Sequence, residues 1–193
     1  LGGDYTASQA YGRLINDESN LFSTYFWYDK LGRIVVSQNS KQFNELPQRW
    51  SYTKYDVLGR VVEAGEKVDN GTTNPEFESI FGSVVSGHYN PIVVDDSKLN
   101  DWIDGDGDRI EVTRSYYDIT NPDIATDLPT YFVQNQMNMR KRISSVTYEK
   151  TYDGLDETYD HATHYDYDIH GNVKQLLQDH QELEAIGDPD ISA

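Results

Sequence analysis

The sequence predicts an all-β protein made of consecutive antiparallel β-hairpins. Three observations predict this fold class. A short segment with Tyr-Asp ahead of a Gly recurs along the chain, and the residues on both sides of it are typical of strands. In addition, 12% of the 193 residues are aromatic while only 37% are hydrophobic. Aromatic side chains, 15 of them Tyr, bury a large area and keep a polar edge, so the composition favours a thin sheet over a thick core.

The recurring segment is the strongest signal. Residues 24–38 and 51–65 align without a gap, and residues 163–178 form a third copy. Each copy has the pattern Tyr-Asp-x-x-Gly, followed by Arg in the first two copies and by Asn in the third. A lone hairpin cannot bury its apolar face, so we expect one continuous repeat region over 1–193. Its hairpins are predicted at about 22–38, 49–65, 110–149 (degenerate) and 161–178.

Each repeat predicts a hairpin whose turn is the motif itself. Before Tyr-Asp the residues alternate, and after the Gly they are β-branched, which is strand chemistry on both sides. An Asp at the first position of a type I turn accepts the backbone N–H two residues on. A Gly can then take the positive φ that lets the strands pair. The predicted turn residues are Asp29, Gly32, Arg33, Asp56, Gly59, Arg60, Asp168, Gly171 and Asn172.

A worn copy is predicted between the second and third clear repeats. Residues 114–118 provide its first half and residues 142–148 its second half, with about two dozen residues inserted between them. Residues 152–154 predict another broken turn. Two turn-rich insertions and a short helical turn are also predicted, at 69–75, 121–129 and 180–186.

The motifs YDKLGR at 28–33 and YDVLGR at 55–60 resemble the YD-repeat, or Rhs-repeat, family. Residues 135–153 and 159–173 resemble the variant of Rhs proteins seen in Bacteroidetes, and the resemblance covers about 8–183. It implies a long β-sheet strip that spirals into a hollow shell. In that family the shell encloses a C-terminal toxin or effector domain, or serves as a cell-surface scaffold. The resemblance thus implies two partners, the remainder of a longer chain and an enclosed effector domain, and a secreted or cell-surface location.

The chain departs from the toxin-releasing members of that family at one motif. Those members carry an Asp-Pro-x-Gly autoproteolysis signature, whereas here Asp190 and Ile191 follow Pro189. The protease is therefore not carried over, and no catalytic residue is predicted. The chain begins at Leu1 without an initiator Met, so we expect an internal, non-enzymatic section of shell that is too short to close by itself.

Charge argues against several kinds of partner. The 33 acidic and 16 basic residues give a net charge of −17, and the sequence has no Cys. Nucleic-acid binding needs clustered Lys and Arg, and a membrane span needs about 18 consecutive apolar residues, so neither is expected.

From Thr151 onward, eleven acids and one base accompany four of the five His. A dense acidic field raises the pKa of His, which suggests a pH-responsive segment; the alternative is a solvated acidic surface.

One acidic motif resembles the start of a calcium loop. Asp104, Asp106 and Asp108 alternate with Gly, and calcium favours clustered oxygen ligands. The EF-hand pattern fails at its sixth and twelfth positions, which lack the required Gly and Glu. We interpret the motif as the polar tip of a hairpin between strands at 102–103 and 110–116, with a weak calcium site as the alternative. No other cofactor is predicted.

Three histidines lie close together in the sequence. On a strand His164 and His170 would share a face, while His161 would point the other way, so the spacing does not favour a zinc site. His164 aligns with Tyr25 and Tyr52 of the other repeats. We therefore interpret these histidines as structural.

Two functions are open at this point. The leading interpretation is a non-enzymatic structural section of a β-shell. The alternative is a cell-surface binding module that uses exposed aromatics to contact glycans or proteins, with or without calcium. The best candidates are residues 25–28, where alternation places Tyr25 and Trp27 on one face and Phe26 and Tyr28 on the other. One of these pairs is expected in the core.

Overall fold

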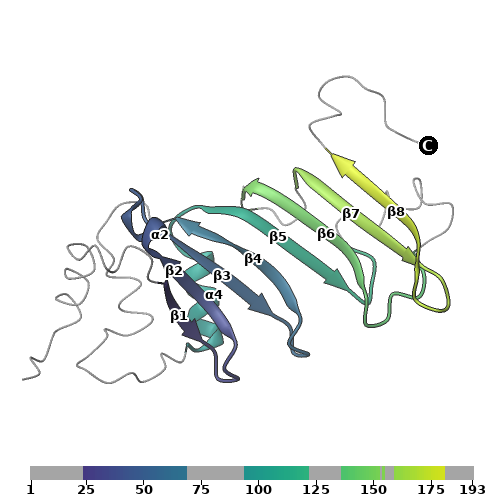
Figure 1. Ribbon diagram of the computed structural model, residues 1–193, viewed down its shortest axis with the longest axis horizontal. Coiled ribbons are helices and arrows are strands. Elements are labelled where there is room, and N and C mark those ends of the chain that lie inside the picture. Colours follow the sequence, from purple (N-terminus) through teal and green to yellow (C-terminus); the bar gives the residue numbers. More distant parts are fainter. Residues whose placement is uncertain (1–23, 69–93, 122–135, 153, 155–158, 181–193) are drawn as a thin grey trace, which may run out of the picture. The chain divides into compact units, whose positions relative to one another are not determined.

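The structure is a computed structural model, and it describes residues 24–68, 94–121, 136–152, 154 and 159–180. This part of the chain contains eight strands and two helices (Figure 1). They are β1 (Thr24–Tyr28), β2 (Ile34–Asn39), α2 (Ser40–Asn44), β3 (Arg49–Tyr55), β4 (Val61–Val68), α4 (Asp96–Asp104), β5 (Arg109–Tyr117), β6 (Ile143–Thr151), β7 (His161–Tyr167) and β8 (Val173–His180). The strands are hydrogen-bonded in chain order in an antiparallel sheet. The prediction of an all-β, antiparallel fold is confirmed.

The chain divides into two compact units. The first unit comprises Leu1–Thr53 and Glu66–Arg109, and the second comprises Lys54–Gly65 and Ile110–Ala193. The hairpin of β3 and β4 therefore contributes residues to both units.

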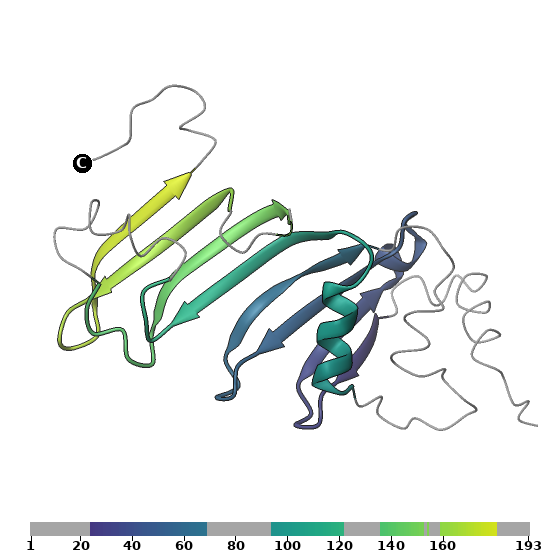
Figure 2. The same ribbon diagram turned by 180° about the vertical axis from the view of Figure 1, so that it is seen from behind.

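The first unit has an aromatic core between its strands and α4. Trp27, Trp50 and Tyr52 are each less than 5% exposed. The rings of Trp50 and Trp102 meet edge to face with their centroids 6.3 Å apart, an arrangement that contributes about 0.5–1.5 kcal/mol beyond the buried area. Figure 2 shows α4 lying across the strands of this unit. Tyr25 and Trp27 were expected to share one face of the strand and to be buried or exposed together. Instead, Trp27 is buried while Tyr25 is 41% exposed.

The prediction of a strand at 102–103 is wrong, because these residues belong to α4. Leu99, Trp102 and Ile103 are the buried residues of this helix, and their spacing of three and four places them on one helical face. The Asp95 side chain accepts a hydrogen bond from the backbone N–H of Ser97 and caps the helix. The acidic motif is consequently a helix-to-strand connection rather than a hairpin tip, while the strand predicted at 110–116 lies within β5.

The second unit buries polar side chains on one face of its strands. In β7, residues 162, 164 and 166 are buried and the residues between them are half-buried. Their neighbours on β6 include Ser145 and Thr147, which are at most 4% exposed. Buried polar atoms destabilise a fold unless they form hydrogen bonds. The residues on this face must therefore be able to form hydrogen bonds with one another.

The two halves of the worn repeat pair with each other. β5 and β6 are antiparallel, and Tyr117 faces Ile143 beside a bulge. The same offset places Tyr28 opposite Ile34 and Tyr167 opposite Val173 in the clear repeats.

Several predicted features lie outside the described residues: the insertion at 69–75, residues 122–129, Asp153 and residues 181–186. His180 ends β8 and is not helical. Within the described ranges, no helix has the length and apolar character of a membrane span.

Candidate functional site: the hairpin turns

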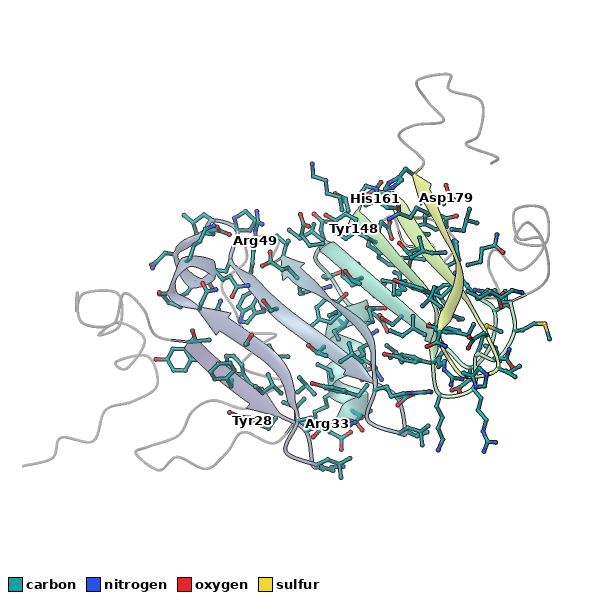
Figure 3. The ribbon with its side chains drawn as sticks, turned by 45° about the vertical axis from the view of Figure 1, so that its right-hand side comes forward. Tyr28, Arg33, Arg49, Tyr148, His161 and Asp179 are labelled. Atoms are coloured by element: carbon teal, nitrogen blue, oxygen red, sulfur yellow. The ribbon has the colours of Figure 1, made fainter. Side chains whose placement is uncertain are left out.

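The first hairpin turn is held by one carboxylate. Asp29 Oδ1 accepts hydrogen bonds from the backbone N–H groups of Leu31 and Arg33, each at 2.9 Å. Asp29 Oδ2 accepts a third bond, from Arg33 Nε, at 2.5 Å. The backbone N–H of Asp29 donates to the carbonyl of Arg33, and Gly32 takes a φ of 77°, which a residue with a side chain rarely adopts. Figure 3 shows Tyr28 and Arg33 beside this turn.

The other two clear turns repeat this geometry. Asp56 accepts the corresponding three bonds at 2.9, 2.9 and 2.6 Å. Asp168 accepts two backbone bonds at 2.8 and 2.9 Å and a third at 2.9 Å from the Asn172 side chain. Gly59 and Gly171 have φ values of 81° and 91°. Asn172 thus replaces the turn-closing bond of the Arg but not its positive charge.

The worn turn is closed by the same kind of Asp. The backbone N–H of Asp118 donates to the carbonyl of Arg142 at 3.2 Å. Asp118 Oδ1 accepts the backbone N–H of Lys141 at 2.5 Å. The inserted segment therefore leaves and returns at one point of the hairpin, and the strands beyond it keep the register of the clear repeats.

In the second unit, the Arg of one turn reaches the Tyr-Asp of the next. The Arg60 guanidinium carbon lies 4.2 Å from the ring centroid of Tyr117, and Arg60 Nη1 lies 2.7 Å from Asp118 Oδ2. In return, the Tyr117 hydroxyl donates to the carbonyl of Val61 at 3.1 Å. A guanidinium over an aromatic face is attractive, so these contacts fasten two successive hairpins at their turn ends.

The next step along the second unit repeats the contact of Arg with Tyr and the bond from the Tyr hydroxyl. The Arg142 guanidinium carbon lies 5.5 Å from the ring centroid of Tyr167, and the Tyr167 hydroxyl donates to the carbonyl of Ile143 at 2.7 Å. We call this set of residues the turn ladder: Arg60, Val61, Tyr117, Asp118, Arg142, Ile143 and Tyr167.

Sequence reasoning assigned the Asp and Gly of the motif to the turn but missed the ladder. The motif Tyr was assigned to burial of a sheet face, and the Arg to the turn alone. Both also act between hairpins, across sequence separations of 57 residues for Arg60 and Tyr117 and 25 for Arg142 and Tyr167. One feature of the sequence could have indicated these contacts: Tyr precedes and Arg follows Asp-x-x-Gly in the same copies of the motif.

The pKa of each of the four turn aspartates is held below its ordinary value. Burial pushes the pKa of Asp29 upward, but the hydrogen bonds from Arg33 and Leu31 and the Arg33 charge outweigh it. The same balance lowers the pKa of Asp56. A hydrogen bond from a backbone N–H is the largest cause at Asp118, and one from a neighbouring side chain is the largest at Asp168.

These shifts predict acid sensitivity. A carboxyl group titrates near pH 3.9 in an unfolded chain, and the turn carboxyls have lower pKa values in the folded chain. Their stabilising contribution is therefore complete well above pH 3.9 and is lost as the pH falls through the folded values. We expect the double variant D56N/D168N to lose less stability between pH 5 and pH 2.5 than the parent, measured by urea unfolding at a series of pH values.

The matched control for this prediction is Asp106→Asn. Asp106 is an exposed carboxylate outside the hairpin turns, and its replacement should leave the acid slope of the parent. An equal acid slope in the parent and in D56N/D168N would contradict the prediction.

The ladder predicts a specific role for a single hydroxyl. Tyr167→Phe keeps the ring beside Arg142 but removes the donor to the Ile143 carbonyl, and we expect a loss of about 1 kcal/mol in the free energy of unfolding. Tyr165→Phe is the control, because its ring stacks against that of Tyr167 with centroids 6.4 Å apart and it removes a neighbouring hydroxyl. Urea unfolding compares the two variants; losses of the same size would contradict a ladder role for Tyr167.

The loop that carries the calcium candidates surrounds a lysine. Lys67 is 2% exposed, and its Nζ donates to the carbonyls of Ile103, Gly105 and Gly107 at 3.0, 2.7 and 2.9 Å. The C-terminal end of a helix attracts positive charge, and Ile103 lies in the last turn of α4. Gly107 has a φ of 101°, and a Cβ there would overlap the carbonyl of Val68. The ammonium therefore occupies the position at which these carbonyls converge.

The three acidic side chains of this loop lie outside the Lys67 contacts. Asp104, Asp106 and Asp108 are exposed, and Asp104 Oδ1 lies 3.6 Å from Arg109 Nη1. No group of three or more His, Asp or Glu side chains suited to a metal ion occurs among the described residues.

The structure separates the three histidines discussed above. His164 is 1% exposed, with its Nδ1 2.8 Å from Ser145 Oγ, while His170 lies exposed in the last turn. A Ser and His at this distance resemble a nucleophile and base, but both side chains are at most 1% exposed. His161 instead meets His180, a residue that the sequence spacing did not single out.

The aromatic run at 25–28 does not form a single platform. Tyr25 and Phe26 are 41% and 44% exposed, and alternation directs them to opposite faces of β1. Trp27, one of the four candidates in this run, is 4% exposed.

No protein-family model matches the chain, and no curated protein sequence matches it. The resemblance to YD repeats therefore depends on the motif residues themselves.

Proposed function

We propose that the chain is a non-enzymatic structural section of a β-sheet shell of the YD-repeat kind. In this proposal the hairpins continue into the remainder of a longer chain, and the assembled shell encloses or scaffolds a C-terminal effector domain. The proposed secreted or cell-surface location follows from the same resemblance.

The observation that carries the proposal is the turn ladder. Arg60 and Arg142 each contact the Tyr of the next hairpin in the second unit, so at these two steps the motif specifies a neighbour as well as a turn. The hairpin of β5 and β6 has such contacts on both sides, through Tyr117 to the preceding hairpin and through Arg142 to the following one, an arrangement suited to lateral addition. Repetition with neighbour contacts is the physical basis of extended repeat proteins.

The test uses the intact native protein that contains this chain. Limited proteolysis followed by mass spectrometry is expected to show an effector domain that is cleaved much more slowly than the same domain in isolation. The double variant R60A/R142A should lose this protection, while Arg140→Ala, an exposed neighbour of the ladder, should keep it. Equal cleavage rates for the effector domain in the native protein and in isolation would contradict the proposal.

The exposed rings of Tyr25 and Phe26 favour the binding module as a second candidate. Calorimetric titration of the chain with a glycan panel, with and without calcium, separates the two functions. Saturable binding that is lost in Tyr25→Ala would favour the binding module. Trp27→Ala is less informative because Trp27 belongs to the core.

A further inference from the structure

A row of rings crosses three strands of the second unit. Tyr148 of β6 faces His161 of β7, and His161 faces His180 of β8. The ring centroids of Tyr148 and His161 are 5.1 Å apart with the planes 5° from parallel; those of the two histidines are 5.2 Å apart. Figure 3 shows Tyr148 and His161 on their neighbouring strands. Strand register thus brings together two imidazoles that are 19 residues apart.

The two histidines approach each other through ring nitrogens. Nδ1 of His161 and Nδ1 of His180 are 3.4 Å apart, which is longer than the roughly 2.7–3.2 Å of an ordinary hydrogen bond. Two nitrogens bound to one zinc ion at about 2.0–2.1 Å and at a tetrahedral angle lie about 3.3–3.4 Å apart. A right-angled arrangement, typical of Cu(II) or Ni(II), would bring them to about 2.9 Å. The observed separation favours the tetrahedral ion.

Neighbouring residues orient the pair. The Tyr148 ring stacks on His161, and the Tyr148 hydroxyl donates a hydrogen bond to Glu111. Because its hydroxyl is held by Glu111, Tyr148 supports the His161 ring by stacking and is not one of the two proposed ligands. The acids next to the histidines have other partners: Asp160 accepts the backbone N–H of Lys150, and Asp179 accepts the Tyr159 hydroxyl.

We infer that His161 and His180 bind a zinc ion through their Nδ1 atoms, joining β7 to β8 at the end away from the hairpin turn. Water completes the coordination beyond these two ligands of the described chain. Asp160 and Asp179 adjoin the two histidines in the sequence, and their negative charge favours a cation here by long-range attraction. This site does not depend on the proposed shell function.

The experiment is thermal unfolding of the full chain after removal of metals with a chelator. Addition of zinc chloride should raise the melting temperature in a saturable way, because a ligand that binds the folded state stabilises it, whereas magnesium chloride should not. His180→Gln should abolish the shift or weaken zinc binding about tenfold or more. His170→Gln removes an exposed His and leaves the pair intact, so its zinc response should equal that of the parent.

If His180→Gln is less stable than the parent, its melting temperature alone does not report zinc binding. Spectroscopy of the parent protein then provides an independent test. Nitrogen-15 spectra of the parent should show that zinc shifts the Nδ1 signals of two histidines and leaves those of His164 and His170 in place. Cobalt(II) in place of zinc should give the intense visible bands of a tetrahedral ion. A parent protein without a zinc response, or the same response in His180→Gln, would overturn the inference, as would a weak octahedral cobalt spectrum.

Discussion

Replacing Lys67 with Met is expected to lower the free energy of unfolding of the first unit by about 3 kcal/mol, because three carbonyls lose a charged donor and one of them is fully enclosed. Met fills much of the same volume, so the loss reports hydrogen bonds rather than a cavity. Urea unfolding followed by tryptophan fluorescence measures it directly, since Trp50 and Trp102 pack against each other in this unit.

The control for Lys67 is Lys41→Met. The Lys41 side chain is 86% exposed and pairs loosely with Glu45 at 3.8 Å, so its replacement should change stability by less than about 0.5 kcal/mol. Equal stabilities for K67M and K41M would mean that Lys67 does not hold the loop. Recovery of K67M stability on addition of calcium would show that calcium can replace the ammonium at these carbonyls, and would support a metal role for this loop.

The second large effect is a loss of stability as the pH falls from about 6.5 to about 4. Burial lowers the pKa of His164 from 6.5 to about 4, although Asp179 pulls it the other way. Between these values the unfolded chain binds a proton that the folded chain does not, so stability decreases with decreasing pH. At about 1.36 kcal/mol for each pH unit of separation, the loss amounts to about 3 kcal/mol.

The variants for this prediction are His164→Gln and His170→Gln. His164→Gln keeps a polar partner for Ser145 but cannot take up a proton, so its stability should be nearly flat from pH 7.5 to pH 5, above the range in which the turn carboxyls titrate. His170→Gln should keep the full slope. The measurement is the urea midpoint at pH 7.5, 6, 5 and 4; a parent protein that becomes more stable towards pH 5 would refute it.

The behaviour of His164 corrects the expectation drawn from charge. The acids after Thr151 suggested histidines with raised pKa values that would gain a proton in mild acid. For His164 the effect of burial is larger and opposite in sign. The sequence shows the acids but not that residue 164 faces inward on β7, which depends on the pairing of three strands.

Local features were predictable and distant ones were not. The Asp29 turn lies within five consecutive residues, so its hydrogen bonds follow from the motif. The contact of Arg60 with Tyr117 and the enclosure of Lys67 by α4 join segments far apart in sequence, and only the fold reveals them. The misassigned strand at 102–103 is different, because Leu99, Trp102 and Ile103 already show helical spacing; the Gly-rich acidic motif beside them favoured a hairpin instead.

The closure of the worn turn by Asp118 and Arg142 has a practical consequence for protein engineering. This hairpin keeps its register although residues 119–141 separate the two ends, whereas three residues separate Asp29 from Arg33. The contact of Asp with the backbone at Arg closes the hairpin in both cases, although the connecting segments differ greatly in length. The turns are therefore natural positions for grafting an epitope, a fluorophore tag or a protease site, provided that the flanking Asp and Arg are kept.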